Sequence, residues 1–165
     1  MPRHPAETAT MSPEHEGLVR ASWRRFEPFA RDWAPVFYSR LFEVHPRSRA
    51  LFAATDMHLM QNKFGDMLGW MVQSLGNPER LVSEVARLGR QHQTYGVRDA
   101  DYASAGAALL WTLEQAFGHD WTPDLQAAWT EAFLLFSWVM RRAALKATGE
   151  FPIPSRTSSE IPTKP

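Results

Sequence analysis

The chain has 165 residues, and its 18 Lys and Arg side chains balance 18 Asp and Glu, so its formal net charge is zero. This length predicts one domain with a substantial core, and the neutral balance argues against a nucleic-acid-binding surface. The absence of cysteine excludes disulfides, thiolate zinc sites, thiol redox chemistry and cofactors attached through a C-x-x-C-H motif. No secretory leader and no run of about 18 apolar residues occurs, so we expect a cytoplasmic protein without a membrane span.

Both ends of the chain are polar and contain several prolines, and we expect neither to pack into the core. Residues 1–11 form a predicted flexible N-terminal tail, and residues 148–165 form a predicted disordered C-terminal tail rich in Pro and Ser. The segment between them, residues 12–147, is the predicted domain.

Three helical elements are predicted before residue 53. The run Ser12-Pro13-Glu14 is a helix start, with Ser as the cap, Pro in the first turn and an acid near the positive end of the helix. Helical spacing predicts that the buried face of this helix consists of Leu18, Ala21 or Ser22, Phe26 and Phe29. A second helix is predicted from about residue 32 to 42, and a short helical turn ends at Phe52.

Longer helices follow. The helix from about residue 56 to 75 has apolar residues three and four positions apart, namely Met57, Met60, Phe64, Met67, Leu68, Met71 and Leu75. The next, from about 79 to 95, carries Leu81, Val85, Leu88 and His92 on one face and ends at Gly96. Helices at about 99–117, which we expect Asp99 to cap, and 122–147 complete the chain, and no segment alternates with the period of a strand. The chain is therefore predicted to be all-α.

His92 occupies the last place on an apolar helical stripe. A ring nitrogen directed into an apolar space is costly unless a hydrogen bond or a metal satisfies it. Taken alone, such a histidine is more often a hydrogen-bonded core residue than a ligand. The alternative is a haem pocket, in which His92 is the axial ligand, the Met/Phe helix before it is an apolar wall, and Tyr38 contributes a phenol.

Several segments together resemble a bacterial single-domain globin related to the haem domain of flavohaemoglobins. They are residues 36–46, 51–52 and 63–68, the run Leu88-Gly-Arg-Gln-His92-Gln-Thr-Tyr-Gly-Val97, Tyr102 and Trp129. They follow the family's order over roughly residues 12 to 144. The resemblance implies a globin fold, a three-over-three helical sandwich around a non-covalent b-type haem.

The resemblance also implies roles for individual residues. His92 matches the proximal iron ligand, and the carbonyl of Leu88, one turn back, is the nearest acceptor for its other N–H. Tyr38 matches a distal tyrosine that donates to bound gas, although it is alternatively a packing residue with its hydroxyl at the surface. The haem pocket implied by the resemblance further contains Phe52, Tyr95, Val97 and Tyr102.

The distal helix departs from the family pattern. Phe64 matches an apolar position over the haem, and one turn earlier stands Met60, where many relatives have Gln. Gln61 is displaced by one residue, which rotates it by about 100° around the helix. We favour Met60 at the distal place over a local shift that brings in Gln61, and a thioether can itself ligate haem iron. Lys63 lies either near a haem propionate or simply in solvent.

The resemblance favours a protein that reversibly binds oxygen, nitric oxide or carbon monoxide for storage, transport or buffering. The alternative is a haem enzyme, a nitric oxide dioxygenase or a peroxidase-like protein, served by a separate reductase. Tyr102 matches the family's proximal tyrosine, but the position of the carboxylate that accompanies it falls near Ala144, beside Arg141, which weakens the case for the dioxygenase. No catalytic residue is assigned, and the oligomeric state is left open between a monomer and a homodimer.

Overall fold

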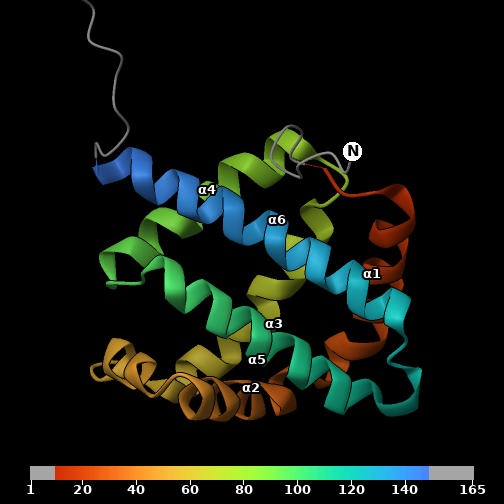
Figure 1. The fold of residues 1–165 in the computed structure, drawn as a ribbon, viewed down its shortest axis with the longest axis horizontal. Helices are drawn as coiled ribbons and strands as arrows, with labels where there is room; N and C mark the ends of the chain where they lie inside the picture. Colours follow the sequence, from red (N-terminus) through yellow and green to blue (C-terminus); the bar gives the residue numbers. More distant parts are fainter. Residues whose placement is uncertain (1–9, 149–165) are drawn as a thin grey trace, which may run out of the picture.

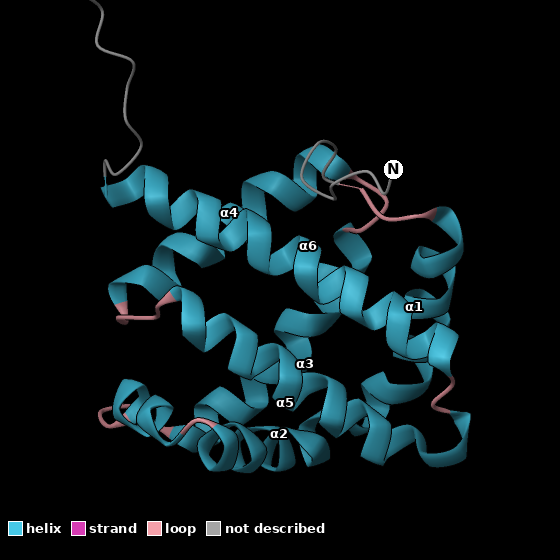
Figure 2. Cartoon of the chain, in the orientation of Figure 1, coloured by secondary structure: helices cyan, strands magenta, loops and turns pink. Residues whose placement is uncertain are grey.

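The structure of the protein is a computed structural model that describes residues 10–148. Within that range the chain is helical and has no strand, which confirms the all-α prediction (Figure 2). The α-helices are α1 (Pro13–Phe26), α2 (Ala30–Val44), α3 (Met57–Ser74), α4 (Pro78–Thr94), α5 (Asp99–Phe117) and α6 (Pro123–Thr148), and the 3-10 segments are η1 (Glu27–Phe29), η2 (Pro46–Phe52) and η3 (Gly118–Asp120). No helix in the described range is long and apolar enough to cross a bilayer.

Side-chain caps fix where most of these helices begin. A side-chain oxygen accepts a backbone N–H of the first turn at Ser12, Asp56, Asn77 and Thr122. Such caps satisfy donors that a helix leaves unpaired at its N-terminus. The start of α5 differs from the expectation of a cap at Asp99. There the carboxylate of Asp101 reaches back and accepts the N–H of Arg98 at 2.7 Å.

The helices pack in crossing pairs (Figure 1). The last helix, α6, lies against α1 and α4, while α2 lies against α3 and α5. The closest approach joins α4 and α6 at Gly89. A Cβ atom on Gly89 would stand 2.3 Å from the carbonyl oxygen of Met140 and 2.6 Å from its Cα, so only glycine allows the two backbones to meet.

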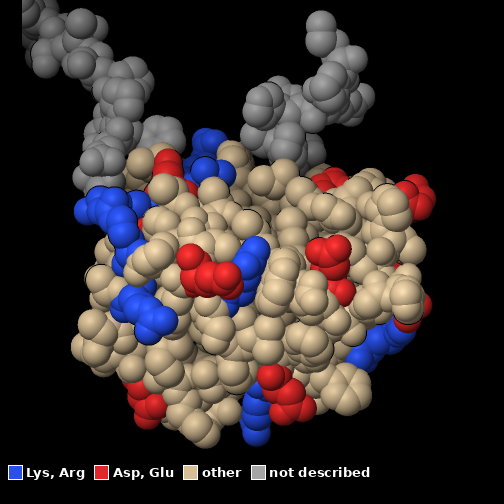
Figure 3. Space-filling view, turned by 60° about the horizontal axis from the view of Figure 1, so that its bottom comes forward, with Lys and Arg blue, Asp and Glu red and all other residues tan. Residues whose placement is uncertain are grey.

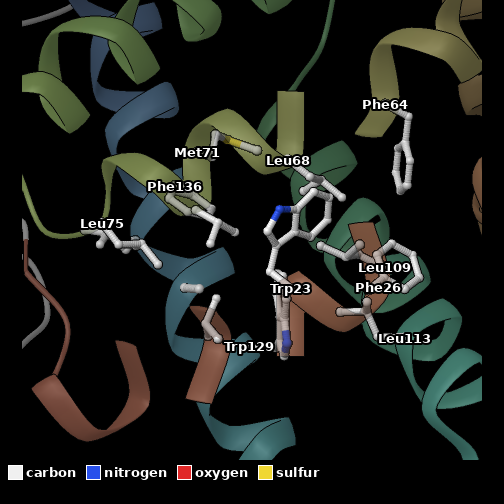
Figure 4. Close-up of a cluster of buried hydrophobic side chains, with 14 of the residues drawn as sticks. Trp23, Phe26, Phe64, Leu68, Met71, Leu75, Leu109, Leu113, Trp129 and Phe136 are labelled. Atoms are coloured by element: carbon white, nitrogen blue, oxygen red, sulfur yellow. The ribbon is translucent and has the colours of Figure 1, made fainter. Parts of the chain in front are cut away.

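The core fills the space where α1, α3, α5 and α6 converge (Figure 4). Trp23 and Trp129 are its largest members, 3% and 1% exposed. The indole Nε1 of Trp129 donates to the hydroxyl of Ser22 at 2.9 Å, which satisfies both polar groups inside the core. The remaining side chains are aliphatic, aromatic or thioether groups, among them Phe26, Leu68, Met71, Leu109, Leu113 and Phe136.

Two expectations need correction. Met11, assigned to the N-terminal tail, is buried in the core, so the packed part of the chain begins before residue 12. Phe29, predicted on the buried face of the first helix, is 57% exposed, and Val19 and Trp23 fill that face instead. The reason is that α1 ends at Phe26 and the tighter turn η1 breaks the helical spacing. The rest of the two predicted tails, residues 1–9 and 149–165, lies outside the described residues.

Candidate functional site

His92 lies in the last turn of α4 and is half-buried. Its Nδ1 is 2.7 Å from the carbonyl oxygen of Leu88. A carbonyl only accepts, so Nδ1 carries the proton and donates it. In the neutral ring the lone pair is then on Nε2. The predicted partnership between these two residues is confirmed.

Burial keeps this imidazole neutral. It lowers the pKa of His92 below the usual 6.5, and the hydrogen bond to Leu88 opposes this with a smaller effect. Within residues 10–148 no side chain or backbone group forms a hydrogen bond with Nε2. The described residues also contain no group of three or more His, Asp or Glu side chains that could hold a free metal ion. The described residues therefore offer one unpaired ring nitrogen here and no cluster of metal ligands around it.

Tyr38 lies in the middle of α2 inside a cage of aromatic rings. Its ring centroid is 5.0 Å from that of Phe37, 6.3 Å from Phe42, 5.5 Å from Phe52 and 6.1 Å from Phe64. Only 6% of the residue is exposed, and burial raises the pKa of Tyr38 to about 12. Its hydroxyl has no hydrogen-bond partner among the described residues. The group is thus a protonated, unused donor in an apolar environment.

The distal candidates on α3 differ in burial. Phe64 is buried and stacks on Phe37 with 4.9 Å between ring centroids. Met60 and Gln61 are both half-buried, and Met60 packs against the core. Lys63 is exposed. The choice between Met60 and Gln61 stays a prediction, because both lie at the border between core and solvent.

The residues after His92 form the surface of the site. Tyr95 caps α4 and is 63% exposed, with its ring edge-on to the His92 imidazole at 6.4 Å between centroids. Gly96 follows with a φ of 86°, the left-handed conformation expected at a helix end. Val97 is half-buried against the core. The exposed ring of Tyr95 therefore contacts the candidate ligand His92 at the end of α4.

Tyr102, in the first turns of α5, is buried and has one cation, Arg141, and two carboxylates, Asp99 and Asp101, near it. Burial raises the pKa of Tyr102 to about 12; the positive charge of Arg141 opposes this effect, and the negative charges of Asp99 and Asp101 add to it. Both carboxylates belong to α5 itself, and residues 141–148 of α6 contain none.

Among the polar contacts that were not predicted, one joins the end of α2 to the start of α5. His45 Nε2 lies 2.7 Å from Asp101 Oδ1, with the two side chains 21% and 16% exposed. The sequence places His45 before a proline at a helix end, and nothing in that local pattern indicates a partner 56 residues away.

Two surface grooves lie away from these groups. One, of about 590 Å³, is lined by His15 and by residues of α6 including Glu131 and Leu134. The other, of about 270 Å³, lies between α2 and Trp111 of α5. Neither is lined by His92 or Tyr38, so the candidate site is identified by its chemistry rather than by the size of a hollow.

Comparison with known proteins gives the family. The globin family model matches residues 36–140. The chain is similar to proteins named anaerobic nitrite reductase NSHB5 from rice, Oryza sativa subsp. indica and subsp. japonica, each 28% identical over 127 residues, covering 74% of this chain and 88% of the relative. It is also similar to neuroglobin-2 of the trout Oncorhynchus mykiss, 28% identical over 142 residues, covering 78% of this chain and 89% of the relative. The chain therefore belongs to the globin family, and this membership implies that it binds haem.

Proposed function

We propose that the protein holds a non-covalent haem b through His92 and reversibly binds oxygen or another diatomic gas. The observation that carries this proposal is the hydrogen bond from His92 Nδ1 to the carbonyl of Leu88 at 2.7 Å. It commits one ring nitrogen and leaves the other as a free lone pair on a neutral imidazole, which is the form that ligates iron. Storage, transport or buffering of the gas would follow from such a site.

The residues present fit a haem. One nitrogen donor, an aromatic cage and half-buried apolar side chains are the components of a pocket for a flat, hydrophobic group. The apolar wall consists of Phe52, Phe64, Leu88 and Val97, with Tyr95 and Tyr102 at the proximal end. Haem iron with one axial imidazole supplies a coordination position for a diatomic gas. All further selectivity comes from side chains of this chain.

Tyr38 is the proposed donor to the gas. A neutral hydrogen bond contributes about 1 kcal/mol, and more where water is excluded. Its pKa of about 12 keeps the hydroxyl protonated throughout the physiological range. We further propose Met60 rather than Gln61 on the gas side of the pocket, and Lys63 beside a haem propionate. Met60 packs against the core, whereas the exposed Lys63 is free to reach a carboxylate.

A globin with these features lies, we infer, near the single-domain bacterial globins and the haem domain of flavohaemoglobins. The competing function is enzymatic: nitric oxide dioxygenation or peroxidase-like turnover with a separate reductase. The end of α6 offers Arg141 and no carboxylate, which supports gas binding over dioxygenation, because a carboxylate on that helix would make His92 more electron-donating. A cytoplasmic location and a monomeric or homodimeric state stay predictions.

Absorption spectra test the proposal. The purified protein is expected to show a Soret band, and its ferrous form is expected to bind carbon monoxide and oxygen reversibly. His92→Ala should lose the wild-type ferrous spectrum, while His58→Ala, which removes an exposed histidine on α3, should retain it. If His92→Ala keeps the ferrous spectrum unchanged, His92 is not the ligand. Sustained consumption of nitric oxide or peroxide with a cellular reductant would favour the enzyme.

Absorption spectra also distinguish whether Met60 or Gln61 faces the bound gas. Gln61→Leu should leave oxygen dissociation unchanged if Met60 faces the gas, and Met60→Ala should change it. A six-coordinate low-spin ferrous spectrum that disappears in Met60→Ala would show that the thioether itself ligates iron.

A further inference from the structure

The charges of this neutral chain are unevenly distributed along its sequence. Three segments, residues 45–55, 85–98 and 132–148, contain eight of the 18 Lys and Arg and none of the 18 Asp and Glu. The cations are Arg47, Arg49, Arg87, Arg90, Arg98, Arg141, Arg142 and Lys146. The remainder of the chain is correspondingly acidic. Basic residues near helix C-termini complement the helix dipole, but this explains only those in the last turns of α4 and α6.

These three segments meet in the fold. A Cβ on Gly96, just after α4, would lie 3.7 Å from Leu51 of η2, and α4 touches α6 where Gly89 contacts Met140. The end of α6 and the turn after α4 lie at the same edge of the molecule in Figure 1. Figure 3 shows Lys and Arg side chains gathered at that edge, beside the end of the described chain. Segments distant in sequence therefore form one basic region around the end of α4.

Some of these cations are balanced locally, and others are not. Arg87 lies 3.5 Å from Glu84, at the border of its segment. Asp99 and Asp101 begin the next helix; Asp101 pairs with His45, and Asp99 is exposed directly after Arg98. Besides Arg87, the exposed cations on η2 and around the end of α4 are Arg47, Arg49, Arg90 and Arg98, and we call these four the basic face. No ion pair joins any of them to a described carboxylate.

Tyr95 is the exposed aromatic residue of this region. It is 63% exposed, and its ring meets the His92 imidazole edge-on at 6.4 Å between centroids. Tyrosine and arginine are both enriched at protein–protein interfaces, where a rigid ring anchors a contact surrounded by polar groups. The contact between the exposed Tyr95 ring and His92 connects the surface that carries these arginines to the candidate ligand.

We infer that the basic face, with Tyr95, is the docking surface for an acidic electron-transfer protein that keeps the iron reduced. The inference rests on the proposed function, because gas binding needs ferrous iron and the iron must regain an electron each time it is oxidised. One electron passes from the reduced centre of the partner to ferric iron, and no bond forms or breaks. Carboxylates on the partner would be attracted to the arginines, which raises the encounter rate at low ionic strength.

The experiment uses the haem-loaded protein and a reduced, acidic plant-type [2Fe–2S] ferredoxin as the probe. The rate of iron reduction is measured by stopped flow at several salt concentrations, and the affinity for oxidised ferredoxin is measured by calorimetry. The test variant is the double change Arg90→Glu with Arg98→Glu. The matched control is Arg24→Glu with Arg31→Glu, which reverses two exposed arginines on α1 and α2 and changes net charge by the same amount.

We expect the wild-type reduction rate to fall about tenfold or more as salt screens the charges. The Arg90/Arg98 variant should be about tenfold slower and bind ferredoxin more weakly, while the Arg24/Arg31 variant should stay within about twofold of wild type. Tyr95→Ala should weaken ferredoxin binding without removing its salt dependence. Reduction by dithionite, a small-molecule reductant, should be equal in wild type and the two arginine variants.

Equal losses of reduction rate and ferredoxin affinity in the test and control variants would overturn the inference. Such losses would depend on the net charge of the protein and not on the basic face. Binding of the face to phosphatidylserine vesicles, but not to phosphatidylcholine vesicles or ferredoxin, would assign it to a membrane instead and would also overturn it. A protein without a Soret band would refute the proposed function itself. A normal Soret band and normal gas binding without ferredoxin binding would refute only the docking surface.

Discussion

His45 Nε2 lies 2.7 Å from Asp101 Oδ1, and the same carboxylate accepts the backbone N–H of Arg98 at 2.7 Å. Asp101 thereby joins the end of α2, which carries Tyr38, to the start of α5, which follows the turn after His92. A single carboxylate bridges the two sides of the candidate site.

Asp101→Ala is expected to lower the free energy of unfolding by about 1–2 kcal/mol more than Asp99→Ala. Both changes remove an acid from the first turn of α5, so the loss of helix-dipole stabilisation is matched. Only Asp101 accepts hydrogen bonds from His45 and Arg98. Urea denaturation at pH 7 measures the difference, and equal values for the two variants would mean that the bridge contributes nothing.

Gly89→Ala is expected to destabilise the protein by about 1–3 kcal/mol and to weaken haem retention. The added methyl group would stand 2.3 Å from the Met140 carbonyl oxygen, so α4 must move away from α6. Gly17→Ala is the control, because a Cβ on Gly17 of α1 meets nothing within 4 Å. That change should stabilise the helix by about 0.5–1 kcal/mol. Denaturation midpoints measure both effects: the midpoint should fall in Gly89→Ala and rise in Gly17→Ala.

Tyr38→Phe is expected to act in opposite directions on folding and on gas binding. The Tyr38 side chain is 6% exposed and its hydroxyl has no described partner, so removing that hydroxyl should stabilise the haem-free chain by up to about 1 kcal/mol. In the haem-loaded protein the same change should speed oxygen dissociation about fivefold or more. Tyr95→Phe removes the hydroxyl of an exposed ring and should change neither stability nor oxygen dissociation. Faster dissociation together with lost stability would mean that the hydroxyl is already paired in the fold.

His92 should make the stability of the haem-free chain depend on pH. Because burial lowers its pKa below 6.5, the unfolded chain takes up the proton first on acidification. Stability attributable to His92 is therefore complete above pH 6.5 and falls as the pH drops below that value, until the folded ring is protonated as well. The unfolding free energy of wild type and His92→Gln should run parallel above pH 6.5 and diverge below it, with wild type losing more. Parallel curves down to pH 5 would contradict a lowered pKa.

Much of the fold follows from local signals in the sequence. Capping residues such as Ser12 and Thr122, and the glycine at 96, mark helix ends through interactions with their immediate neighbours, so a single sequence suffices to find them. The errors arise where tertiary packing decides. Phe29 is exposed because a 3-10 turn interrupts the helical register on which its predicted burial rested. Met11 is buried because it packs against core residues that are distant in sequence.

The site divides in the same way. The bond from His92 to Leu88 spans one helical turn, so it could be predicted once the resemblance had identified His92 as a ligand whose other N–H needs an acceptor. The aromatic cage around Tyr38 and the pair between His45 and Asp101 join distant segments, and no periodicity reveals them. The sequence does not decide whether Gln61 or Met60 faces the bound gas, because a rotation of α3 by about 100° would put one residue in the place of the other.

The glycine contact between α4 and α6 also limits how the candidate ligand can move. Gly89 precedes His92 by three residues, or about 4.5 Å along the helix axis. Backbone in contact with backbone acts as a fulcrum, because no flexible side chain lies between to be compressed. Displacement of His92 toward or away from the pocket is then a tilt of the last turn of α4, not a slide of the whole helix. The same tilt would carry Tyr95, and so would couple the imidazole to the exposed surface of the molecule.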